Sequence, residues 1–226
     1  MRPGYEVFKQ RVEQLTQTEL MNRQHTAERA LMSMGITFNV YSEGEGTERI
    51  MPLDIIPRVV AGEDWNRLEE GLIQRITALN LFIDDIYNDQ KILNDGVVPR
   101  DLIETSKCYL EACRGLKPPK GIWCHITGTD LIRGDDGTFM VLEDNLRCPS
   151  GVSYMLENRN ISNRIFPNAL RNNKVQPVRN YPDLLLKNLL ELSNLQTSKP
   201  EVVLLTPGIY NSAYFEHSTL AKLMGI

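Results

Sequence analysis

The stretch His125–Arg147 reads HITGTDLIRGDDGTFMVLEDNLR, in which two apolar runs flank Asp136 and Gly137. An Asp-Gly pair between alternating apolar segments is a strong indication of a β-hairpin with a two-residue turn. If these two residues form the turn, the pairs along the two strands follow by counting outward from it. The sequence therefore predicts an antiparallel hairpin in which Asp130 lies opposite Glu143.

The acidic face of this hairpin predicts a metal site. Asn145 joins Glu143 there, because side chains two residues apart share one face of a strand. Opposed carboxylates repel each other, so a partly buried pair either has a raised pKa or binds a cation. Two carboxylates and an amide oxygen suit Mg²⁺ bound to nucleotide phosphates, and no His or Cys favours zinc. A solvated hairpin edge with ordinary surface acids is the alternative. The same face is also expected to carry Ile126, Ile132, Phe139 and Val141, and to be apolar near the turn.

Helices are expected on both sides of the hairpin in the sequence. The clearest begins near Glu63 and carries an apolar stripe with helical spacing. Residues 5–34 and 213–224 also have helical patterns, and Thr37–Tyr41 alternates like a strand. The stripe is expected to face the core and comprises Trp65, Leu68, Leu72, Ile76, Leu79, Ile83 and Ile86.

The order of these elements predicts an α/β (α+β) fold. Val202–Leu205 is a continuous apolar run, typical of a strand buried on both faces, and a helix follows it. That pair indicates the start of a Rossmann-like layer. A parallel strand needs neighbours, so we expect the sequence to be part of a longer protein. The expected divisions are a helical segment 1–35, a helix-rich subdomain 36–116, a hairpin-bearing domain 117–197 and the incomplete layer 198–226.

Composition limits the classes of function. The chain has 226 residues, a formal net charge of −4 and 42% hydrophobic residues, which is typical of a soluble protein. It contains no apolar stretch of the roughly 18 residues that a membrane span requires. The slightly acidic balance argues against a nucleic-acid partner. Without a secretory signal, a cytoplasmic location with reduced thiols is expected; the cysteines are Cys108, Cys113, Cys124 and Cys148.

Several longer motifs resemble one known family. The segment EDNLRCPSGVSYMLENR at 143–159 is similar to the signature of the circularly permuted ATP-grasp proteins, which include a glutathionylspermidine synthase-like group. The segments MPLDIIPR at 51–58, LNLFIDDIYND at 79–89 and LTPGIYNSAYFEH at 205–217 also resemble that family. The likeness runs from about residue 35 to the end, and it implies that the chain is the N-terminal portion of such a protein, with part of an ATP-grasp fold.

The resemblance implies an ATP- and Mg²⁺-dependent ligase. In such chemistry a carboxylate is phosphorylated, and an amine or thiol displaces phosphate from the acyl phosphate; the substrate would be a small molecule or a peptide. By similarity, Asp130, Glu143 and Asn145 would hold Mg²⁺, and Arg147 would steady the transferred phosphoryl group. Many ATP-grasp enzymes have an arginine where this chain has Gly128. The nucleotide-clamping lysines are not recognisable, so we expect this chain alone to bind ATP poorly.

Weaker candidates lie outside the hairpin. Ser150 and Gly151 precede an expected helix whose backbone N–H groups could bind an anion, although a plain capping turn is the simpler reading. A further group surrounds the loop after the expected strand, where α/β proteins bind ligands. Its members are substrate candidates: Tyr210, Asn211, Glu216 and His217.

Two other functions remain open from the sequence. The chain could be a non-catalytic binding or scaffold module that retains the hairpin, or a metal-dependent phosphoesterase using the same acids. The latter usually needs more ligands for a second metal. The sequence does not identify the carboxylate, the nucleophile or the oligomeric state.

Overall fold

The computed structural model describes residues 4–42, 45–172, 174–193 and 200–226. These residues form two compact units, each assembled from separated parts of the chain. The first contains the described residues within 1–61, 150–191 and 199–226, and the second is built mainly from 62–149. The division into 1–35, 36–116, 117–197 and 198–226 stays a prediction about domains.

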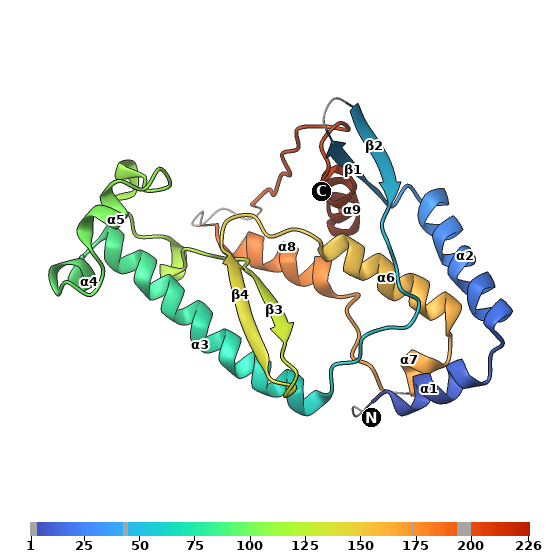
Figure 1. Ribbon diagram of the computed structural model, residues 1–226. Helices are drawn as coiled ribbons and strands as arrows, with labels where there is room; N and C mark the ends of the chain where they lie inside the picture. Colours follow the sequence, from blue (N-terminus) through green and yellow to red (C-terminus); the bar gives the residue numbers. More distant parts are fainter. Residues whose placement is uncertain (1–3, 43–44, 173, 194–199) are drawn as a thin grey trace. The chain divides into compact units, whose positions relative to one another are not determined.

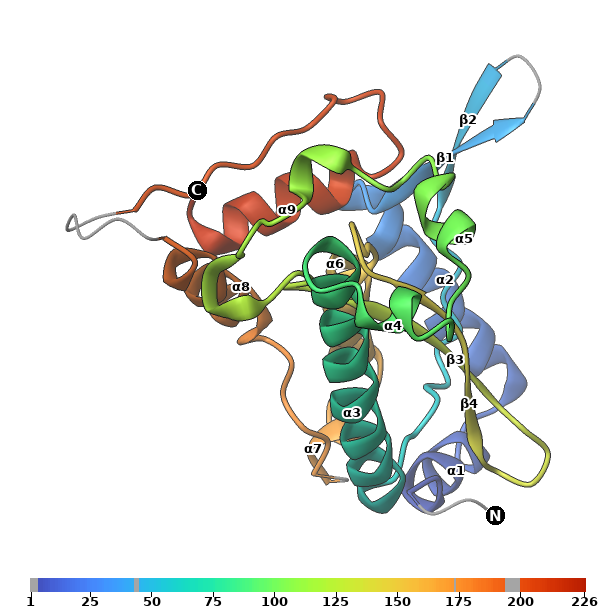
Figure 2. The same cartoon turned by 90° about the vertical axis from the view of Figure 1, so that its left-hand side faces the viewer.

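The first unit is mainly helical, with one two-stranded antiparallel hairpin. Figure 2 shows α8 and α9 of this unit side by side. Its elements are α1 (Glu6–Glu13), α2 (Gln17–Ser33), β1 (Thr37–Ser42), β2 (Glu45–Ile50), α6 (Val152–Ile165), α7 (Ala169–Asn172), α8 (Tyr181–Glu191) and α9 (Tyr214–Met224).

A capping box divides the helical stretch expected at 5–34 into α1 and α2. The Glu19 N–H donates to Thr16 Oγ1 at 3.2 Å, and the Thr16 N–H donates to Glu19 Oε2 at 2.8 Å. Each residue thereby satisfies a backbone donor that a helix start leaves free. One apolar cluster joins α1, α2, α6 and α7. Its buried members are Phe8, Ala27, Leu31, Ile36, Ile55, Ile161, Ile165, Phe166, Ala169 and Leu170.

The second unit is built on one long helix, which confirms the helix expected from near Glu63. Its elements are α3 (Gly62–Tyr87), α4 (Lys91–Asn94), α5 (Arg100–Glu104), the 3₁₀ turns η1 (Glu111–Cys113) and η2 (Pro119–Gly121), β3 (Gly128–Arg133) and β4 (Phe139–Asn145). Of the expected core-facing stripe on α3, Ile86 is buried and most other members are half-buried. Trp65 is 54% exposed, so its assignment to a core was wrong.

The C-terminal half of α3 fixes the chain that enters the hairpin. Asn80 Oδ1 accepts the backbone N–H groups of Trp123 and Cys124 at 2.8 and 3.0 Å. The Trp123 indole N–H donates to Asp84 Oδ1 at 3.0 Å, and its ring stacks on Tyr87. This segment is therefore tied to one side of α3 immediately before β3 begins.

The strand expected at Val202–Leu205 is wrong for the structure. These residues have no strand assignment, and Val203 and Leu205 are 77% and 90% exposed. A strand requires a partner for its backbone groups, and the sheets among the described residues are the pairs β1–β2 and β3–β4. The described fold is therefore α+β with two small hairpins, and the start of a Rossmann-like layer is not seen. The described helices include none with the length and apolar character needed to cross a bilayer.

Candidate metal centre

The turn of the β3–β4 hairpin uses three residues, so the predicted two-residue turn was wrong. The Gly134 N–H donates to Thr138 O at 2.8 Å, and the Gly137 N–H donates to Gly134 O at 2.9 Å. Gly137 has φ +87°, in the left-handed region that this type of loop needs. Asp136 accepts the Thr138 N–H and hydroxyl, both at 2.9 Å, which favours the longer loop.

A β-bulge beyond the turn restores the predicted pairing of the acids. Leu131 pairs with Val141, whereas Asp130 pairs with Glu143, so Leu142 is an extra residue on β4. The third loop residue shifts the pairing by one residue, and the extra residue at the bulge shifts it back. The expected opposition of Asp130 and Glu143 is therefore confirmed, although the path to it differs from the predicted one.

The two faces of the hairpin differ in character. Asp130, Glu143 and Asn145 are exposed on the face away from α3, and Asn145 Nδ2 donates to Glu143 Oε1 at 3.2 Å. Ile132 lies on this face as predicted, opposite Met140. Phe139 and Val141 were wrongly placed there, because the longer loop moves both to the face toward α3.

Two ion pairs attach the hairpin to α3, which lies beside it in Figure 1. Near the turn, Arg133 contacts Asp64 at 2.7 Å. At the other end, Arg75 donates to Asp144 Oδ2 from Nε at 2.7 Å and from Nη2 at 2.6 Å. The hydrogen bonds from Arg75 lower the pKa of the Asp144 carboxyl, and a 2.9 Å hydrogen bond from the Thr129 hydroxyl lowers it further.

The lowered pKa of Asp144 predicts acid sensitivity of the hairpin unit. An unfolded Asp has a pKa of about 3.9, so the pair stabilises the fold above that pH and loses its effect as pH falls through the lower folded value. We expect Asp144→Asn to be destabilised at pH 7 and to approach the wild type as the pH falls through the lowered pKa of folded Asp144. Urea unfolding monitored by tryptophan fluorescence measures this, since Trp65 and Trp123 both lie in this unit. A difference independent of pH would contradict the assignment.

Arg147 and Gly128 flank the acidic end of the hairpin. Arg147 lies beyond β4 in an exposed segment, and its role toward phosphate stays a prediction. Gly128 pairs with Asn145, and a Cβ added at Gly128 would lie 2.7 Å from Pro149 Cβ. Real Cβ atoms essentially never approach so closely, so a side chain at position 128 would force Pro149 or the strand backbone to shift.

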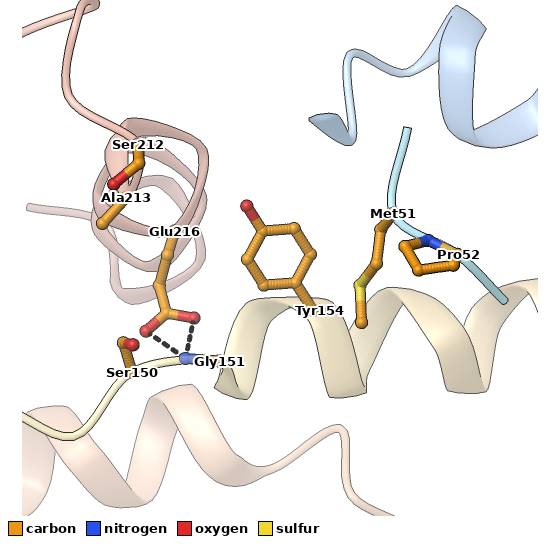
Figure 3. A pocket seen from close by; sticks show the side chains of 8 residues that line it. All are labelled: Met51, Pro52, Ser150, Gly151, Tyr154, Ser212, Ala213 and Glu216. Atoms are coloured by element: carbon orange, nitrogen blue, oxygen red, sulfur yellow. Dashed lines mark hydrogen bonds between the residues drawn. The ribbon is translucent and has the colours of Figure 1, made fainter. Parts of the chain in front are cut away.

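The start of α6 holds a carboxylate of the chain itself (Figure 3). Gly151 is the N-cap residue with φ +106°, and the expected cap by the Ser150 side chain is not formed. Glu216, 5% exposed, accepts the Gly151 N–H at 2.9 and 2.7 Å and the Ser153 N–H at 3.1 Å. The backbone donors expected to bind an anion are thus used by Glu216.

An open pocket of about 490 Å³ adjoins this contact. The Tyr154 hydroxyl donates to Thr37 O at 3.1 Å, and burial, with Glu216 nearby, raises the pKa of Tyr154. Of the four substrate candidates, Glu216 alone lines this pocket. Elsewhere, Asn211 Oδ1 accepts the Ala213 N–H, the His217 ring bonds to the Thr206 hydroxyl at 2.8 Å, and Tyr210 is 84% exposed. The pocket is lined by Met51, Pro52, Ser150, Gly151, Tyr154, Ser212, Ala213 and Glu216.

Other metal chemistry finds no support in the described ranges. No three His, Cys, Asp or Glu side chains gather there into a group able to hold a metal ion. The four cysteines are not joined by disulfides in this structure. The hairpin therefore offers two carboxylates and an amide, a set that leaves room for water or phosphate oxygens around a hard cation.

Residues 57–226 match the model of the family described as circularly permuted ATP-grasp type 2. This chain belongs to that family. The resemblance in the sequence motifs is thus confirmed at the level of the ATP-grasp family.

Curated relatives extend beyond the present sequence. The chain is 53% identical over 209 residues to an uncharacterized protein of Synechocystis sp., covering 92% of this chain and 44% of the relative. It is 47% identical to an uncharacterized protein of Mycobacterium tuberculosis, covering 92% and 37%. A Frankia casuarinae protein named "Putative glutamate--cysteine ligase 2-2" is 35% identical over 227 residues, covering 100% and 26%. The chain thus spans less than half the length of these relatives.

Proposed function

We propose that the full-length protein is an ATP- and Mg²⁺-dependent ligase that joins a carboxylate to an amine or thiol through an acyl phosphate. The observation that carries this proposal is the opposition of Asp130 and Glu143 on an open hairpin face, with Asn145 bonded to Glu143. Membership of the ATP-grasp family and the ligase name of the Frankia relative support it.

The residues on this face fit a magnesium ion. The donor set consists of oxygen atoms, and two opposed carboxylates repel each other unless a cation lies between them. ATP with Mg²⁺ would supply the activated phosphoryl group. Asp130 and Glu143 would hold the cation, Asn145 would orient Glu143 and supply a further oxygen, and Arg147 would neutralise charge on the phosphate.

The finer assignments belong to the same proposal. We propose that the full-length protein acts on an amino acid or a short peptide. We also propose that it is located in the cytoplasm and has no nucleic-acid or membrane partner. The name of the Frankia relative makes glutamate and cysteine the first pair to test. Kinship with the glutathionylspermidine synthase-like group rests on the motif at 143–159.

ADP release by the full-length protein tests the proposal. ATP is supplied with pairs of amino acids and short peptides, beginning with glutamate and cysteine, with and without Mg²⁺. We expect ADP only when Mg²⁺, a carboxylate and a nucleophile are all present. Metal binding without ADP release for any pair would favour the scaffold alternative, to which the absence of an arginine at position 128 also points. Hydrolysis of a simple phosphate ester without ATP would favour a phosphoesterase.

A further inference from the structure

We propose that Arg75 of α3 and Asp144 of β4 form a positioning pair that keeps Glu143 and Asn145 on the metal-binding face. The proposal rests on the proposed function, since it assumes that this face binds the cation. Neither residue is placed in contact with the cation; the pair acts through the backbone of β4.

The first argument is the alternation of β4. Asp144 lies between Glu143 and Asn145, and neighbouring side chains on a strand point to opposite faces. Its carboxylate is held by two N–H groups of Arg75, and its side chain is 9% exposed, against 45% for Arg75. Fixing Asp144 toward α3 therefore directs its two neighbours away from α3.

The second argument is that the pair reaches the other strand. The Thr129 hydroxyl donates to Asp144 Oδ1 at 2.9 Å, which leaves Oδ2 to Arg75. Thr129 pairs with Asp144 and directly precedes Asp130. The Asp144 carboxylate thus holds Thr129, the residue before Asp130, as well as Asp144 itself, the residue after Glu143.

The third argument is the bulge at Leu142. Without the bulge, the ladder would continue from Leu131–Val141 to place Leu142 opposite Asp130, and Glu143 would turn toward α3. Glu143 would then lie on the face that Arg75 contacts. In the observed register Arg75 is paired with Asp144, so Glu143 remains on the open face opposite Asp130.

Mn²⁺ binding to the full-length protein, followed by electron paramagnetic resonance of the free ion, tests this pair. We expect Arg75→Met to weaken Mn²⁺ binding by about 10-fold, at the low end of losses seen when groups behind metal ligands are removed. Arg75→Lys, which keeps the charge, is expected to recover part of the loss. In the ADP assay, Arg75→Met should raise the Mg²⁺ concentration for half-maximal rate and leave the rate at saturating Mg²⁺ unchanged.

Arg133→Met is the matched control. It breaks the pair with Asp64 on the same helix and the hydrogen bond from Arg133 to Gly137 O, both at the turn end of the hairpin, beyond the bulge. Its Mn²⁺ affinity is expected to stay within about twofold of the wild type, because the acids are fixed at the other end. An equal loss in both variants, or wild-type affinity in Arg75→Met, would overturn the positioning pair. Wild-type Mn²⁺ affinity in Glu143→Gln would instead overturn the proposed metal site.

Discussion

Glu143→Gln is expected to lower Mg²⁺-dependent ADP release by the full-length protein by about 100-fold or more. The substitution keeps the size of the side chain and removes the charge opposite Asp130. A bound metal contributes several kcal/mol of charge stabilisation in phosphoryl transfer, and each 1.4 kcal/mol changes the rate tenfold. Steady-state ADP production at saturating ATP and a range of Mg²⁺ concentrations measures the effect.

Stability separates this loss from damage to the fold. Removing one of two opposed carboxylates relieves repulsion, so tryptophan-monitored unfolding of Glu143→Gln is expected to match or exceed the wild type. Asp135→Asn removes the same charge from the exposed turn of the same hairpin and is the matched control. We expect it to retain activity. Full activity in Glu143→Gln would remove the basis of the proposed ligase.

The pairing of the acids was predicted correctly because two departures from the assumed ladder cancel, namely the third residue of the loop and the extra residue at the bulge. Asp136-Gly137 is compatible with loops of two or three residues, and the Asp136–Thr138 bonds that favour three are visible only in the structure. The bulge did leave a trace in the sequence: Phe139–Leu142 is four consecutive apolar residues, which breaks the alternation of a regular strand.

The contacts that attach the hairpin to α3 were missed for a different reason. Asp64 and Arg75 are eleven residues apart, about three helical turns and roughly 16 Å, so they share one face of α3. Their partners, Arg133 and Asp144, share one face of the hairpin. Opposite charges at matching separations were present in the sequence, but only the fold shows which helix the hairpin meets.

Patterns of apolar residues predicted the positions of helices better than they predicted which residues are buried. The period along α3 located the helix. A periodic stripe does not show whether another element covers each apolar residue, and Trp65 is exposed in the structure. Val202–Leu205 reads as a buried strand, but the described fold gives it no strand partner. Glu216 was placed within a helix as a substrate candidate, while its contact with Gly151 joins residues that lie 65 apart in the chain.

Glu216→Ala is expected to destabilise the start of α6 by about 3 kcal/mol. The buried carboxylate of Glu216 accepts the N–H groups of Gly151 and Ser153, and each buried donor left without an acceptor costs about 1–3 kcal/mol. Glu216 also places a negative charge at the positive end of α6, which is favourable. Hydrogen–deuterium exchange of the peptide 151–156 in the full-length protein measures the local effect, and roughly 100-fold faster exchange is expected.

Two further variants define what the Glu216 carboxylate does. Glu216→Gln retains one acceptor oxygen and turns an NH₂ group toward backbone donors, so its exchange rate is expected to fall between wild type and Glu216→Ala. Glu13→Ala removes an exposed acid of the same unit and is expected to leave peptide 151–156 unchanged. If Glu216→Ala exchanges at the wild-type rate, the carboxylate does not stabilise the helix start. Glu216 would then again be available as a substrate-binding residue in the pocket beside Tyr154, because its charge would not be committed to the backbone of α6.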